Sequence, residues 1–240
     1  MLDGRLLFAR YAFKPNQLGL CGGQEAAALL DYCIEGHADD GLGQLIPQFQ
    51  AAYPYLQFIA HANGIANPQD PRVVEAYWLG NELLKRVDMR EFYRFIEERF
   101  GQRLPPRLQK YVLSKVPQGA RPHHSFHVLD VSIRTGALAT EVESLDQCRI
   151  SWGSVARTTG DRAGIIFQPL VWQNGRLSLG QPTERVVSCK VAGKGYLTNL
   201  RPGDLVSMHW NWLCDRLTPR QARRLSSLTE HHITLANQTI

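Results

Sequence analysis

The stretch DLVSMHWNW, residues 204–212, alternates between apolar and polar side chains from Val206 onward. One face carries Val206, Met208, Trp210 and Trp212, and the other carries Ser207, His209 and Asn211. Side chains of a β-strand point alternately to its two faces, so this period of two indicates a half-buried strand. We therefore predict a strand whose apolar face meets a core, and we expect His209 to leave that core.

Further β-rich runs precede this stretch and are separated from one another by turn signals such as Asn174-Gly175. The runs are SFHVLDVSI (125–133), RISWGSVA (149–156), AGIIFQPLVW (163–172) and RVVSCKVA (185–192). Several short strands at this spacing predict a small barrel. After the last strand, Thr218-Pro219 supplies an N-cap and a proline at the first helical position, which predicts a basic terminal helix.

The first half of the chain has the apolar spacing of helices joined by short turns. Residues 24–35 are rich in Ala and Leu and stop at Gly36, a common residue after a helix end. Residues 42–62 keep a helical period, with Pro47 and Pro54 as expected kinks or first-turn residues. Asp70-Pro71 has the form of an N-cap followed by a first-turn proline. We predict helices over all three segments.

The two patterns meet near Gly119-Ala120-Arg121-Pro122. The sequence therefore predicts an α+β fold with a helical domain over residues 1–120 and a β-barrel with a terminal helix over residues 146–240. A connecting strand or linker is expected between them, over residues 121–145.

The charge is concentrated in the second part of the chain. Residues 1–145 hold 15 Lys and Arg against 16 Asp and Glu, whereas residues 146–240 hold 12 against 6, which together give the net charge of +5. The basic residues are mostly single arginines spread over many segments, so we interpret them as a solvated surface. Nucleic acid is therefore an unlikely partner, although OB-like barrels with exposed Trp residues can bind it.

The cysteines and the apolar runs of the sequence indicate the cellular compartment of the protein. The five cysteines are scattered and never have a CxxC spacing, which argues against a disulfide framework or a tetracysteine zinc site. No apolar run approaches the roughly 18 residues that a membrane helix needs, and Arg5 and Arg10 interrupt the N-terminal one. We expect a reducing, cytoplasmic location and no membrane partner.

Three histidines cluster in the segment PHHSFHV, residues 122–128. His123 and His127 are four residues apart, and His124 is three residues before His127, so the three side chains can share a transition-metal ion if the backbone turns suitably. The alternative is a histidine-rich loop that enters a strand. Cys21, directly before Gly22-Gly23, is either an exposed thiol or a small filler residue.

Two motifs in the second part of the chain follow each other in a fixed order. Cys148 opens the pattern C-x4-G-x-V, and residues 203–209 have the form G-D-x-V-x-x-H, which ends at His209. With the strands and the terminal helix, residues 146–228 resemble the HypC-type (HypC, HybG, HupF) maturation chaperones of [NiFe] hydrogenases. The first half, with LFARYAF and PHHSFHV, resembles an uncharacterised family.

The HypC-type resemblance implies an OB-like barrel and a role that is not enzymatic. In that family the cysteine, helped by the histidine, carries iron with cyanide and carbonyl ligands, Fe(CN)2CO, to the precursor of the hydrogenase large subunit. Cys148 would accordingly be the thiolate ligand or a thiol that contacts the partner, and His209 would be its helper. The partners would be that precursor and other maturation proteins. This chain departs from the family because 147 residues precede Cys148 and because Trp152 replaces a proline.

A different class of function stays open. The second hypothesis is a metal-dependent enzyme of unknown substrate, with its ion held among His123, His124 and His127, with or without Cys148. Retention of zinc by the histidines without a partner protein would favour this alternative.

Overall fold

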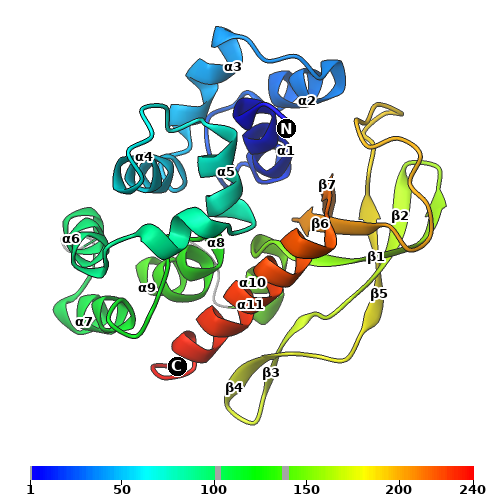
Figure 1. Ribbon diagram of the computed structural model, residues 1–240. Helices are drawn as coiled ribbons and strands as arrows, with labels where there is room; N and C mark the ends of the chain where they lie inside the picture. Colours follow the sequence, from blue (N-terminus) through cyan, green and yellow to red (C-terminus); the bar gives the residue numbers. More distant parts are fainter. Residues whose placement is uncertain (1, 101–103, 137–140) are drawn as a thin grey trace.

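The computed structural model describes residues 2–100, 104–136 and 141–240 of the chain. Helices make up the first part, and a five-stranded sheet, a small hairpin and one long helix make up the second (Figure 1). The fold is therefore α+β, as the sequence predicts. In the described residues, no helix has both the length and the apolar character needed to cross a membrane.

The helices of the first part begin and end largely where the capping residues predict. They are α1 (Gly4–Gln17), α2 (Ala26–Glu35), α3 (Asp40–Leu45), η1 (Ile46–Gln48), α4 (Tyr53–Ala62), α5 (Pro71–Trp78), η2 (Glu82–Arg86), α6 (Met89–Phe100) and α7 (Pro106–Lys115). The carboxylate of Asp70 accepts a hydrogen bond from the amide of Arg72 and begins α5. Gly36 ends α2 in the left-handed conformation, with φ 66°.

Prolines divide the apolar segment 42–62 into three short helices. Pro47 lies in the first turn of η1, and Pro54 lies in the first turn of α4. Proline is tolerated in a first turn because the amide that it lacks would have no helical partner there. The predicted helical segment is thus a series of three helices, α3, η1 and α4, and both prolines are first-turn residues, one of the two expected positions.

The second part is built from seven strands and α11. The strands are β1 (Ser151–Thr159), β2 (Arg162–Phe167), β3 (Leu170–Gln173), β4 (Arg176–Leu179), β5 (Thr183–Ser188), β6 (Leu205–His209) and β7 (Trp212–Arg216), and α11 spans Pro219–Ala236. Five of them form one sheet in the order β1-β2-β5-β7-β6, and β6 pairs back with β1, so the sheet closes on itself. All neighbours are antiparallel except β5 and β7. β3 and β4 form the separate hairpin.

The run 125–133 is helical, and the prediction of a strand there is wrong. It forms α8 (His124–Phe126), a π-helical segment (His127–Ser132) and the start of α9 (Ile133–Thr135). Residues 128–132 are all buried, because the hairpin and α11 contribute to the apolar cluster around them. A helix that is buried on every side has no polar stripe, so its apolar run has the same sequence pattern as a buried strand.

The alternation is confirmed over β6, which ends at His209, but its polar face does not reach solvent. Trp210 begins a turn, and Trp212 lies in β7 and in the main core, so the prediction that both continue the apolar face of this strand is wrong. Val206 and Met208 lie in the apolar cluster inside the sheet. Ser207 and His209, on the opposite face, are buried as well because α1 packs over them, and the hydroxyl of Ser207 lies 2.8 Å from that of Tyr11. His209 therefore leaves the sheet interior, as expected, and enters the interface with the helical part.

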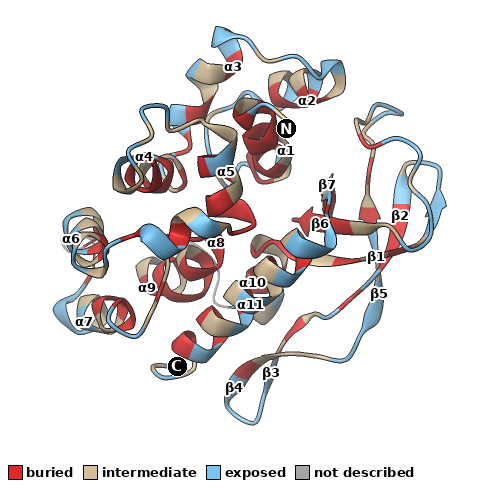
Figure 2. Ribbon diagram, in the orientation of Figure 1, coloured by how far each residue is buried: buried red, intermediate tan, exposed pale blue. Residues whose placement is uncertain are grey.

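That interface is continuous with the main hydrophobic core. The core runs from α1 through the other helices to Trp212, Cys214 and Leu225 of the second part. Figure 1 shows α11 lying between the helices and the sheet, and it packs against α8, β1 and β4. Figure 2 shows buried residues along both sides of this junction. Residues of both parts can therefore contribute to one buried site.

Candidate metal centre

Three side chains at the junction could hold a metal ion together. One donor atom each from His124, Cys148 and His209 lie within 4.8 Å of one another. They come from α8, from the last residue of α10 (Val142–Cys148) and from the last residue of β6. All three line one cavity of about 110 Å³. Cys148 thus ends a helix.

His209 presents a free ring nitrogen to this cavity. Its Nδ1 lies 2.7 Å from the carbonyl oxygen of Tyr11, and because a carbonyl only accepts, Nδ1 must donate. Nε2 consequently keeps its lone pair, and it is buried without a hydrogen-bond partner. Burial lowers the pKa of His209 to about 4, so the ring is neutral at pH 7. A neutral imidazole oriented through its other nitrogen is a common arrangement for a metal ligand.

His124 is oriented in the same way as His209, except that Nε2 is its donor nitrogen and Nδ1 is its acceptor nitrogen. Its Nε2 donates to the carbonyl oxygen of Cys148 at 2.8 Å, which leaves the lone pair on Nδ1. The hydroxyl of Tyr77 donates a hydrogen bond to this Nδ1 at 3.2 Å, so a cation must displace that hydrogen bond to use the lone pair. Burial, and secondarily the nearby His209, hold the pKa of His124 well below its usual value. Both imidazoles can therefore coordinate a cation through a lone pair at neutral pH.

Cys148 supplies the sulfur of the group. Burial raises the pKa of its thiol to about 12, and a hydrogen bond with Trp210 opposes the shift only in part. The thiol keeps its proton at pH 7 until a cation replaces it. Two imidazoles and one thiolate suit iron, zinc or another late divalent transition metal.

The other two histidines of the segment 122–128 have different surroundings. His127 lines the same cavity, but its Nδ1 lies 3.4 Å from the hydroxyl of Tyr55 and it does not belong to the group within 4.8 Å. Burial lowers the pKa of His127 to about 4. His123 is the N-cap of α8, and its side chain accepts a hydrogen bond from the amide of Ser125. The structure thus brings only His124 of the three to the group with Cys148 and His209.

His123 belongs to a buried hydrogen-bonded chain with Ser125 and His232. The amide of Arg121 donates to Nε2 of His232, so Nδ1 of that ring carries the proton and donates to the hydroxyl of Ser125 at 2.7 Å. The hydroxyl then donates to Nδ1 of His123, also at 2.7 Å. These hydrogen bonds join α8 to α11, so the hydroxyl of Ser125 has a structural role.

Replacing Ser125 with alanine should lower the free energy of unfolding by about 1–3 kcal/mol, because Nδ1 of His232 loses its buried partner. Urea unfolding measures the change, and Ser227→Ala on the exposed side of α11 is the matched control. Metal affinity should stay at the wild-type value. An unchanged stability would contradict the role given to this chain of hydrogen bonds.

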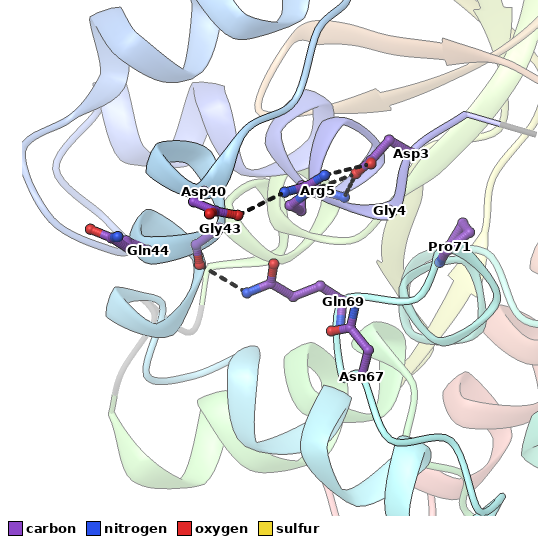
Figure 3. Close-up of a pocket in the computed structure, with 9 residues that line it drawn as sticks. All are labelled: Asp3, Gly4, Arg5, Asp40, Gly43, Gln44, Asn67, Gln69 and Pro71. Atoms are coloured by element: carbon purple, nitrogen blue, oxygen red, sulfur yellow. Dashed lines mark hydrogen bonds and ion pairs between the residues drawn. The ribbon is translucent and has the colours of Figure 1, made fainter.

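A larger hollow of about 520 Å³ lies at the start of α1 (Figure 3). Its polar side chains pair largely with one another: Arg5 forms ion pairs with Asp3 at 2.9 Å and with Asp40 at 3.8 Å. Gln69 donates to the carbonyl oxygen of Gly43 at 2.9 Å. Few polar groups of this hollow are therefore free to bind a ligand. We place the candidate functional site at the metal centre instead.

The sequence singles out each member of the group, and the resemblance pairs Cys148 with His209, but no local pattern places His124 beside them. His124 attracts attention only beside His123 and His127, and the role of Tyr11 in orienting His209 has no local signal. A family model matches residues 1–240, the full sequence given, and describes a family of unknown function, DUF6390. Neither the curated proteins nor the solved structures contain a match. The chain therefore belongs to the DUF6390 family.

Proposed function

We propose that this protein is a metal-binding accessory protein of [NiFe] hydrogenase maturation, which holds iron as cargo at Cys148, His209 and His124. The observation that carries the proposal is the meeting of Cys148 and His209, whose donor atoms lie within 4.8 Å although 61 positions separate them in the sequence. These are the two residues that the HypC-type motifs single out. The closed sheet with its terminal helix also agrees with an OB-like barrel.

The buried Nε2 of His209 supports metal binding independently of any resemblance. A buried nitrogen without a partner costs free energy, and a bound cation would compensate for that cost. His124 adds a third ligand from the helical part, so the iron would be held between the two parts of the chain. This differs from a cargo site at a free chain end, because Cys148 lies inside the chain.

The size of the cavity favours a carrier over an enzyme of the alternative type. Three protein ligands with an open position also occur in catalytic zinc sites. However, about 110 Å³ is well below the roughly 300–1,000 Å³ of pockets that bind organic substrates. The cavity has room for an ion and a few small ligands, which suits a carrier. The metal-dependent enzyme is therefore kept only as the alternative.

The test is metal analysis and infrared spectroscopy of protein purified anaerobically from a host that expresses the hydrogenase maturation factors. We expect iron with cyanide and carbonyl bands in the wild type and their loss in Cys148→Ala. A Cys148→Ala variant that still matures the hydrogenase would overturn the proposal. Absence of the bands from the wild type, with stoichiometric zinc instead, would do the same and would favour the enzyme.

A further inference from the structure

We infer that, before the metal held by His124, Cys148 and His209 carries cyanide and carbonyl ligands, Cys21 is its second thiolate ligand, so that the centre then has two sulfur and two nitrogen donors. The inference rests on the proposed metal site and adds to it a residue from the turn after α1. Neither the HypC-type motifs nor the group of three includes this residue. Cys21 is thereby assigned a specific chemical role.

Cys21 faces the same small space as the other donors. It lines the cavity of about 110 Å³ together with His124, Cys148 and His209. A water molecule accounts for about 30 Å³ of liquid, so this space holds only a few of them and its walls are close together. The two thiols therefore face the same small cavity.

The turn that carries Cys21 is held in place. Nδ2 of the buried Asn16 donates to the carbonyl oxygens of Cys21, at 2.9 Å, and of Gly23, at 2.5 Å. Gly22 has φ 81°, and a Cβ there would come within 2.6 Å of the ring of Phe49. Glycine is required at this position for both reasons. The backbone of Cys21 is thus fixed at the wall of the cavity.

For an ion without cyanide ligands, charge balance in the cavity calls for a second anion. A divalent ion bound by two neutral imidazoles and one thiolate keeps a net charge of about +1. The cavity walls are mainly apolar side chains, and no carboxylate is among the described residues that line them. A net charge in such surroundings costs several kcal/mol or more unless it is paired. A thiolate from Cys21 makes the centre neutral.

Coordination geometry gives Cys21 a place. A tetrahedral ion with three protein ligands has one open position, and a thiolate fills it in Cys2His2 sites. The sulfur of Cys21 lies outside the group whose donors are all within 4.8 Å of one another. It therefore reaches the ion by a change of side-chain rotamer, while its backbone stays where Asn16 holds it. Burial raises the pKa of Cys21 to about 11, so this thiol also gives up its proton only to a cation.

Cobalt(II) titration of the full chain tests this assignment, because each cobalt–thiolate bond contributes to a charge-transfer band in the near ultraviolet. In Cys21→Ser the band per bound cobalt should fall to about half, since one of two such bonds is lost. Cys33→Ser is the matched control, because Cys33 is buried in the helical core away from the cavity, and its band should equal that of the wild type. X-ray absorption of the zinc-loaded wild type counts the ligands without any substitution, and we expect two sulfurs at about 2.3 Å.

The outcomes separate this inference from the proposed function. A full-strength band in Cys21→Ser, or a single sulfur ligand in the wild type, would overturn the role of Cys21 and leave the site of three ligands intact. No thiolate band in the wild type would overturn both. If Cys21→Ser folds poorly, the sulfur count of the wild type still decides.

Discussion

Replacing Cys148 with alanine should weaken the binding of iron(II) or cobalt(II) by at least about 100-fold. Loss of an outer partner that only orients a ligand typically costs 10–100-fold in metal affinity, and loss of a ligand costs at least as much. Cys148 is the sulfur donor of the group within 4.8 Å, and the remaining donors, His124 and His209, are neutral. Competition with a coloured chelator under anaerobic conditions measures the affinity.

Two further variants locate the site. Cys189→Ala removes a buried thiol of the second part that does not line the cavity, and the affinity should not change. His127→Ala removes a ring that lines the cavity but lies outside the group, and the affinity should change far less than in Cys148→Ala. If His127→Ala abolishes binding and Cys148→Ala does not, the ion is held by the histidines of segment 122–128, as the alternative hypothesis states.

Replacing Asp146 with alanine should lower the free energy of unfolding by about 3–5 kcal/mol, the usual cost of removing one partner of a buried ion pair. The side chain of Asp146 is 2% exposed, and its carboxylate binds Arg149 and Arg185, each at 2.8 Å. It also accepts the amide of Leu170 at 2.7 Å. Without it, the guanidinium of Arg149, which is 1% exposed, is left in the core without a carboxylate.

The same carboxylate fixes the end of α10, where Cys148 lies. Asp146 and Arg149 flank Cys148 and tie α10 to β3 and β5. Urea unfolding measures the loss of stability, and Asp31→Ala on an exposed face of α2 is the control, for which we expect a change within about 0.5 kcal/mol. If Asp146→Ala is as stable as Asp31→Ala, the buried ion pairs have no net effect.

Local chemistry made much of the fold predictable. Asp70, Thr218 and Gly36 mark helix ends because their side chains or backbone conformations satisfy polar groups that a helix leaves unpaired. The runs 149–156, 163–172 and 185–192 contain strands because alternating and β-branched residues suit a sheet. These signals act within a few residues, so they are readable without knowledge of the rest of the chain.

The segment 125–133 was not predictable in this way. Its valines favour a strand, but packing against the hairpin and α11 buries residues 128–132 on all sides and stabilises a helix. That change matters for the site, because the helical segment begins at His124 and directs its ring toward Cys148. In a strand, side chains alternate between two faces, and the three histidines would have been placed differently.

The sequence by itself determined the α+β fold class and the helix and strand boundaries that depend on caps and turns, and it indicated Cys148 and His209 as candidate ligands. Only the tertiary structure decided that His124 joins them, that Cys21 lines the same cavity, and that His123 is taken up by Ser125 and His232. The physical reason is distance along the chain. Residues 21, 124, 148 and 209 come to one cavity because α1 packs against β6 and β7 and α8 packs against α11, and no pattern within a few residues encodes this arrangement.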